Sequence, residues 1–125
     1  MPGAARPVKP GQIRLKRAYD PPALADGRRV LVELLWPRGL TRQRARIDLW
    51  LKDVAPSTEL RQWFGHDPDK WDEFRLCYQK ELKRKDDLIK LLKRKAKAGA
   101  ITLVYAARDE EHNGALVLKG FLQKG

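Results

Sequence analysis

Two nearly continuous apolar runs constrain the fold of this chain more than any other feature of its sequence. Residues 29–35 read RVLVELL and residues 100–106 read AITLVYA, and both runs are rich in β-branched side chains. Short apolar runs of this kind are typical of strands covered on both faces, as in parallel sheets. The residues between the runs carry helical spacing, and parallel strands need such a long crossover connection. The sequence therefore predicts an α/β fold with a mostly parallel sheet.

Weaker patterns predict the remaining elements. Residues 12–19 alternate apolar and basic side chains, which indicates a half-buried strand, and residues 48–51 suit a short edge strand. Cap, proline and glycine signals predict helices over residues 42–46, 57–64, 68–84, 86–98 and 115–122. With helices on both faces of the sheet, the expected fold is a small three-layer α/β sandwich.

Length and composition favour one folded domain. With 125 residues a single core is expected, which we assign to residues 12–125. Residues 1–11 hold three Pro and two Gly with almost no large apolar side chain, and they are predicted to form a flexible arm. One Cys excludes an internal disulfide framework, and no apolar run suits a membrane span or a secretion signal. We therefore expect a cytoplasmic protein, whose oligomeric state the sequence does not predict.

Polar loops follow both apolar runs. The first loop is WPRG at residues 36–39 and the second is ARDEEHN at residues 107–113. Because the carboxyl ends of parallel strands lie at one edge of the sheet, we expect these loops to meet there. Guanidinium groups offer paired donors to carboxylates and phosphates, and an indole ring can stack on a base. The predicted site binds a small anionic, nucleotide-like ligand through Trp36, Arg38, Gly39, Tyr105, Arg108 and Asn113.

The second loop also contains groups that can move protons. His112 beside Glu110 or Glu111 would be an imidazole polarised by a carboxylate, which suits general acid–base catalysis near neutral pH. The alternative is structural: Asp109, Glu110 and Glu111 stabilise the start of the last helix while Arg108 pairs with one of them. The sequence leaves open whether the chain is an enzyme. One histidine among scattered acids predicts no metal site, and no cofactor is indicated.

Four ordered motifs resemble those of a known family. They are LWPRG at 35–39, DLWLKD at 48–53 with APS at 55–57, WFGHDP at 63–68, and YAARD at 105–109 with HN at 112–113. Together they resemble the YeaO-like family, a branch of the domain-of-unknown-function class numbered 488, over residues 12–122. The resemblance implies a Rossmann-like α/β domain with a candidate site, and no established activity.

The chain departs from this family pattern in both loops. The broader class often carries an Asp-Val-Arg motif at the first loop and a Cys-containing motif at the second. Here Glu33 and Leu34 stand where close relatives usually have Asp and Arg, and Tyr105 and His112 occupy the region of the cysteines. The resemblance therefore implies neither that pocket arginine nor thiol chemistry for this chain.

A basic segment favours a different function. The chain carries 27 Lys and Arg against 16 Asp and Glu, a net charge of +11, and nine of the basic residues lie within residues 80–97. A basic stripe on one helical face attracts a phosphate backbone whatever its sequence. The alternative prediction is a non-enzymatic protein that binds nucleic acid non-specifically through Lys83, Lys90, Arg94 and Lys97. A solvated outer face would have the same composition, and a third hypothesis assigns exposed aromatic side chains to a protein partner.

Overall fold

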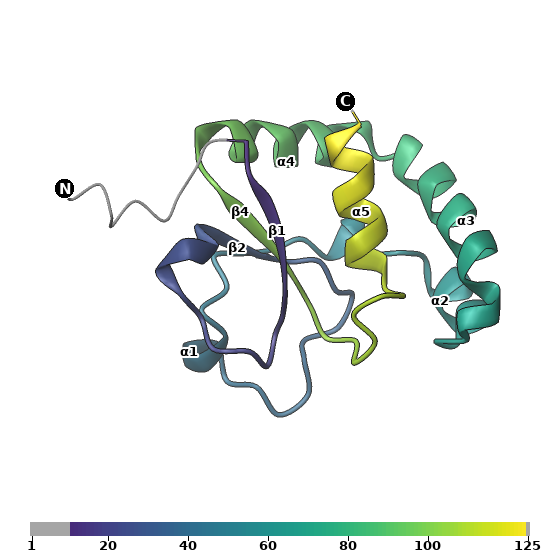
Figure 1. Ribbon diagram of the computed structural model, residues 1–125, viewed down its shortest axis with the longest axis horizontal. Coiled ribbons are helices and arrows are strands. Elements are labelled where there is room, and N and C mark those ends of the chain that lie inside the picture. The colour runs from purple at the N-terminus through teal and green to yellow at the C-terminus, as the bar shows by residue number, and fades with distance from the viewer. Residues whose placement is uncertain (1–10, 125) are drawn as a thin grey trace.

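The computed structural model describes residues 11–124, so the predicted flexible arm lies outside the described residues except for Gly11. A four-stranded, all-parallel sheet forms the centre, with the strand order β1-β4-β2-β3 (Figure 1). The strands are β1 Ile13–Arg17, β2 Arg28–Leu31, β3 Leu49–Trp50 and β4 Ile101–Tyr105. The predicted α/β fold with a parallel sheet is thereby confirmed.

The two apolar runs form the two inner strands. β4 lies between β1 and β2, so that Leu103 is in register with Leu15 on one side and with Val30 on the other. All five residues of β4 are buried. Its sequence shows no alternation of polar and apolar residues because both of its faces are covered.

Within residues 11–124, four of the five α-helices cover one face of the sheet, here called the helical face. They are α2 Thr58–Phe64, α3 Trp71–Lys83, α4 Asp86–Ala98 and α5 Gly114–Gln123. Their buried side chains join those of Ile13, Val30, Ile101 and Leu103 in the main hydrophobic core. Figure 1 shows α2, α3 and α5 to the right of the strands and α4 along the top, with α5 between β1 and α3.

The opposite face, here called the loop face, has a thinner cover. The helix α1 Arg42–Ala45 has a single turn, which Thr41 caps at its start by accepting a hydrogen bond from the Arg44 N–H. The loops that flank it complete a second, small core around Leu31 and Val104. The predicted helices on both faces are therefore present, but the two outer layers are unequal.

The strand β2 is shorter than the apolar run that predicts it. The Val32 N–H still bonds to the Val104 carbonyl, but the Ala106 N–H is taken by the side chain of Glu33. The carboxylate therefore replaces the backbone ladder at the end of the strand. The run continues to Leu35, whose side chain is 70% exposed, because the chain leaves the sheet at this point.

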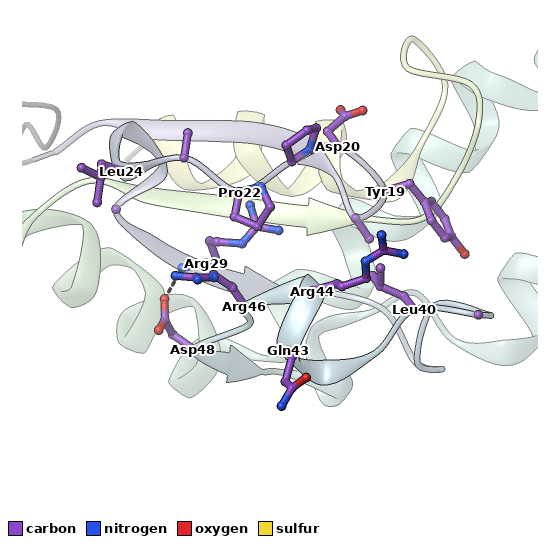
Figure 2. Close-up of a pocket in the computed structure, with 15 residues that line it drawn as sticks. Tyr19, Asp20, Pro22, Leu24, Arg29, Leu40, Gln43, Arg44, Arg46 and Asp48 are labelled. Atoms are coloured by element: carbon purple, nitrogen blue, oxygen red, sulfur yellow. Dashed lines mark hydrogen bonds between the residues drawn. The ribbon is translucent and has the colours of Figure 1, made fainter.

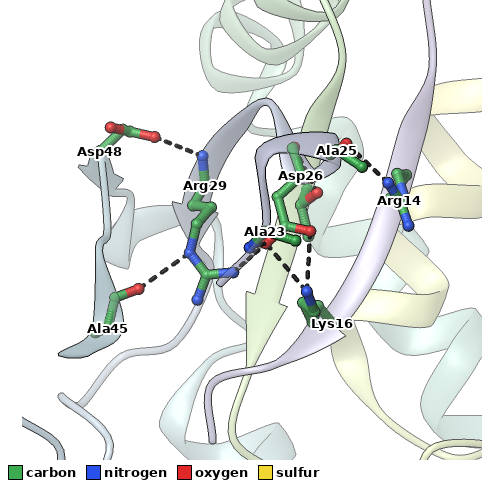
Figure 3. A network of polar contacts seen from close by, with 9 residues as sticks. Arg14, Lys16, Ala23, Ala25, Asp26, Arg29, Ala45 and Asp48 are labelled. Atoms are coloured by element: carbon green, nitrogen blue, oxygen red, sulfur yellow. Dashed lines mark hydrogen bonds and ion pairs between the residues drawn. The ribbon is translucent and has the colours of Figure 1, made fainter. Parts of the chain in front are cut away.

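A buried carboxylate joins three strands on the loop face (Figure 3). Asp26 accepts hydrogen bonds from Lys16 of β1 at 3.0 Å, from Arg29 of β2 at 2.6 Å and from the Ala23 N–H at 3.0 Å. Its backbone carbonyl accepts from the Thr102 hydroxyl of β4 at 2.6 Å. Burial opposes ionisation of Asp26, yet the bonds from Ala23, Lys16 and Arg29 hold its pKa below the usual value.

Gly27 brings β2 and β4 together. Its φ is +62°, and a Cβ atom at this position would lie 2.1 Å from the carbonyl oxygen of Ala100. The approach is close because the next residue, Arg28, donates its N–H to the same carbonyl and so begins the β2–β4 pairing. Only glycine fits both the backbone angle and the space.

We expect Gly27→Ala to lower the free energy of unfolding by more than about 2 kcal/mol, because a φ of +62° with a ψ of −137° is strained for any residue with a Cβ atom, at about 1–3 kcal/mol, and the clash adds to it. Urea unfolding followed by circular dichroism measures this change. The matched control is Gly120→Ala in α5, where nothing lies within 4 Å of the added methyl group. This control should stabilise the chain by about 0.5–1 kcal/mol. Equal midpoints for the two variants would contradict the role given to Gly27.

Candidate functional site

A pocket of about 440 Å³ lies where the neighbouring strands β2 and β4 reach their carboxyl ends. We call it the edge pocket. Residues that follow the two strands form part of its wall, and the rest comes from α2 with the loop after it, from α3 and from the start of α5. The lining residues are Val32, Glu33, Pro56, Arg61, Gln62, Phe64, His66, Phe74, Ala106, Ala107, His112, Asn113, Gly114 and Ala115.

Glu33 is the half-buried acid of the edge pocket. One of its carboxylate oxygens accepts the Ala106 N–H at 3.0 Å, which fixes the side chain at the end of the sheet. Burial raises the pKa of this carboxyl group, and the hydrogen bond from Ala106 together with the charges of Arg61 and His66 only partly opposes the rise. The neutral form of Glu33 is therefore more accessible than that of a surface glutamate.

Arg61 and His66 supply the basic side of the same pocket. The Nε atom of Arg61 is buried and has no hydrogen-bond partner within residues 11–124. His66 has a φ of +58° and follows Gly65, which ends α2 in the left-handed conformation. A non-glycine residue in this conformation costs about 1 kcal/mol or more, so the loop holds the imidazole at the pocket against a local energetic preference.

His112 pairs with a different carboxylate from those the sequence predicts. Its Nδ1 atom lies 2.9 Å from Oδ2 of Asp109, and its ring meets Trp71 edge-on at 5.3 Å between centroids. Glu110 and Glu111 are both exposed. The pKa of Asp109 lies below its usual value because the carboxylate accepts the Glu111 N–H and pairs with His112. In the structure the imidazole of His112 lies beside Asp109 and not beside Glu110 or Glu111, because the Asp109 carboxylate also accepts the backbone N–H groups of Glu111 and His112.

Asn113 lies at the edge pocket, but its side chain is occupied in the fold. Its Oδ1 atom accepts the Leu116 N–H as the N-cap of α5, and its Nδ2 atom donates to the Asp109 carbonyl. The side chain is buried, at 4% exposure for the residue. Asn113, rather than the three acids before it, therefore caps the last helix.

The other predicted ligand contacts lie outside the edge pocket. Arg38 and Arg108 are exposed, and Tyr105 is buried in the main core. Trp36 packs on the loop face, where its Nε1–H donates to the Leu40 carbonyl at 2.6 Å. Gly39, with a φ of +76°, lines a different cavity on that face. The expected meeting of the two loops in one pocket therefore does not occur, because the first loop turns to the loop face and the second stays near the helical face.

The basic residues of the alternative prediction form an outer surface. Lys83, Lys90, Arg94 and Lys97 are all exposed, at the end of α3 and along α4. Lys90 forms an ion pair with Asp86 at 3.0 Å. No helix in the described part of the chain is long and apolar enough to cross a membrane.

Sequence reasoning missed Glu33 and Arg61 as pocket residues. Glu33 left a visible signal, since it is the one charged residue after Arg29 in an otherwise apolar run. Arg61 gave no such signal. In a helix whose buried side carries Leu60 and Phe64, a neighbouring arginine normally extends into the solvent. Its position becomes clear only when α2 is packed beside the carboxyl ends of β2 and β4.

The fold and these motifs define a small α/β domain, and comparison with known proteins gives its family. The chain belongs to the YeaO-like branch of the DUF488 class: the model described as "Inactive DUF488-N3 subclade" matches residues 12–125. The family suggested by the sequence motifs is thereby confirmed.

Relatives cover almost the whole chain. An uncharacterized protein of Mycobacterium tuberculosis strain H37Rv is 39% identical over 115 residues, which cover 92% of this chain and 97% of the relative. The uncharacterized protein YeaO of Escherichia coli K12 is 40% identical over 111 residues, or 89% of this chain and 96% of that protein. No solved structure matches the chain.

We expect Glu33→Gln to raise the melting temperature at pH 7. Burial raises the pKa of Glu33 in the folded state. The contribution of Glu33 to stability is therefore greatest at pH values below its usual pKa of 4.5, and it is lost as the pH rises through the pKa of the folded state. Glutamine keeps the acceptor for the Ala106 N–H and removes the half-buried charge. The gain should therefore disappear as the pH falls below about 4, measured by thermal unfolding across pH.

The exposed Glu110 provides the matched control, because Glu110→Gln makes the same chemical change outside the edge pocket. It should leave the melting temperature unchanged at both pH values. A melting temperature for Glu33→Gln below that of the unaltered protein at pH 7 would mean that the charged form of Glu33 stabilises the fold.

Proposed function

We propose that this chain is a binding protein whose edge pocket takes a small anionic ligand, with Arg61 as the principal contact. The observation that carries the proposal is the Nε atom of Arg61, which is buried in the pocket wall without a partner in the described chain. A buried donor without an acceptor costs about 1–3 kcal/mol. An oxyanion bound at this point would remove that cost.

The size and position of the edge pocket support this function. Its volume of about 440 Å³ is in the range of sites for small molecules, roughly 300–1,000 Å³. Ligands of parallel α/β sheets bind at the carboxyl ends of the strands. The pocket therefore suits a ligand of the size of a mononucleotide or smaller.

Glu33 makes the affinity for an anion dependent on pH. An ionised carboxylate in the wall would repel an anionic ligand, whereas a protonated one can donate a hydrogen bond to it. Burial already favours the protonated form of Glu33 by raising its pKa. Binding of an anion would favour it further, so ligand and proton bind together.

A binding role without turnover also agrees with the family description, which calls the subclade inactive. The bonds that His112 makes are those of a loop-fixing residue: Asp109 holds its ring, and Trp71 packs against it. Glu110 and Glu111, the other groups considered for catalysis, are exposed to solvent. We therefore propose no acid–base step for this chain.

Nucleic-acid binding is the second candidate, supported by the outer surface of α4 and the end of α3. Of the four basic residues there, Lys83, Arg94 and Lys97 make no ion pair with any residue between 11 and 124. Free cations can displace counterions from a phosphate backbone. The edge pocket carries the preferred function because a buried donor without a partner is costly to the fold, whereas exposed lysines are satisfied by water.

The test is calorimetric titration with AMP, inorganic phosphate and succinate at low and near-physiological salt. We expect saturable binding of at least one of these anions, and Arg61→Gln should weaken it about 10-fold or more, since hydrogen bonds to charged groups contribute about 1.5–3 kcal/mol. The control Arg75→Gln removes the same charge from the exposed surface of α3, where Arg75 pairs with Asp72. It should leave the affinity unchanged.

The pH dependence of the same titration checks the role of Glu33. After allowance for protonation of the anion itself, affinity should increase as the pH falls through the pKa of Glu33, and Glu33→Gln should abolish this part of the dependence. Equal affinities for Arg61→Gln and Arg75→Gln would contradict the proposal. Binding to a mixed-sequence duplex but to none of the small anions would favour the second candidate instead. That binding should be lost as the salt concentration rises and on charge reversal at Lys83, Lys90, Arg94 and Lys97.

A further inference from the structure

A second cavity lies on the loop face, away from the edge pocket (Figure 2). Its volume is about 960 Å³, and it shares no lining residue with the edge pocket. We call it the loop-face groove. It runs between residues 18–24, which follow β1, and residues 39–48, which include α1.

One wall of the groove is apolar. Pro21, Pro22 and Leu24 line it together with the ring of Tyr19. Among residues 11–124, five large apolar side chains are exposed, and two of them, Tyr19 at 45% and Leu24 at 86%, lie in this wall. Apolar surface gathered at a concave site is typical of ligand binding, because a ligand with an apolar body removes it from water.

The opposite wall is basic. Arg44 of α1 and Arg46, the residue that ends α1, both line the groove, and neither forms an ion pair within the described chain. Figure 2 shows the Arg44 side chain directed from α1 toward Tyr19 on the other wall. Arg46 has a φ of +48°, a conformation that glycine adopts without strain at the end of a helix. Glycine would end the helix here without strain, so the arginine adds a positive charge at the groove that the helix end itself does not require.

The floor carries a third arginine. Arg29 is only 3% exposed; its Nε atom donates to the Ala45 carbonyl and its Nη1 atom to Asp26, while Nη2 has no partner in the described chain (Figure 3). Asp48 also lines the groove, but its carboxylate accepts the backbone N–H of Arg29. Asp26 in turn is shared with Lys16. The charges of Arg29 and Lys16 are therefore balanced by those of Asp26 and Asp48, and what the network leaves is one buried donor, Nη2 of Arg29, without a partner in the described chain.

We propose that the loop-face groove is a second ligand site, which takes a small molecule with an apolar body and one oxyanion group, a phosphate or a carboxylate. The oxyanion lies between Arg44 and Arg46, since guanidinium groups bind both kinds of oxyanion in a planar, paired manner. The apolar body lies against Pro21, Pro22 and Leu24. The Nη2 atom of Arg29, a buried donor without a partner in the described chain, offers the oxyanion a further hydrogen bond from the floor.

The test uses phenyl phosphate and benzoate, with inorganic phosphate and phenol as their separate halves. Backbone amide shifts of the isotope-labelled protein locate each probe. We expect saturable shifts in residues 18–24 and 39–48, and at least 10-fold weaker binding of either half. The stronger of the two complete probes identifies the oxyanion as phosphate or carboxylate.

Substitutions of arginine distinguish binding in the groove from attraction by net charge and from binding in the edge pocket. Arg44→Gln combined with Arg46→Gln should weaken binding at least 10-fold, whereas Arg84→Gln with Arg94→Gln, which removes the same charge from exposed positions, should not. Arg61→Gln should leave the groove's affinity unchanged, because that residue belongs to the edge pocket. Arg46→Gly should raise the melting temperature of the protein, because it removes the left-handed strain, and it should still weaken binding of the probe.

Two results would overturn the proposal. One is the absence of saturable shifts in residues 18–24 and 39–48 with either complete probe. The other is equal affinity of the two double variants, because it would show that net charge rather than the groove attracts the probe. Since Arg46→Gly relieves strain, weaker binding in this variant cannot be attributed to misfolding.

Discussion

The buried ion pair between Asp26 and Arg29, with 2.6 Å between Oδ2 and Nη1, holds the loop face of this protein together. A charge in this position must have partners, because desolvation without them costs several kcal/mol. The partners come from different elements: Lys16 from β1, the Thr102 hydroxyl from β4 through the Asp26 carbonyl, and the Ala45 carbonyl from α1. The helical face is covered by four helices and a large apolar core, whereas the segments that cover the loop face are joined to the sheet mainly by this network.

The elements of the fold could be predicted because their signals are local. Continuous apolar runs marked β2 and β4, and caps such as Ser57, which accepts the Leu60 N–H, marked the helix starts. The end of β2 could not be predicted, since it depends on Glu33 reaching Ala106, 73 residues further along the chain. For the same reason no local pattern indicates the network of Asp26, whose partners Lys16 and Thr102 lie on other strands. Pairing of this kind becomes visible only when the strands have been placed side by side.

The candidate site was only partly predictable. The rule that ligands bind at the carboxyl ends of parallel strands directs attention to the edge of the sheet where the edge pocket lies. It does not say on which face each loop continues. Trp36 turns to the loop face because its indole N–H finds the Leu40 carbonyl and its ring meets Trp50 edge-on at 5.4 Å. Each cavity is lined by an arginine whose position no local sequence pattern predicts. Arg61 of α2 lines the edge pocket, and Arg46, at the end of α1, lines the loop-face groove.

The unequal cover of the sheet has a consequence for the dynamics of the protein. Opening of the loop face would expose few fully buried apolar side chains, namely Ala18, Leu31, Ala45 and Val104, whereas opening of the helical face would disrupt the whole main core. Local openings require a free energy that grows with the apolar contacts they break. Hydrogen exchange at the amides of Ala45 and Arg46, which bond within α1, should therefore precede exchange in β4. The loop face is the part of the molecule that can rearrange while the rest of the fold stays intact.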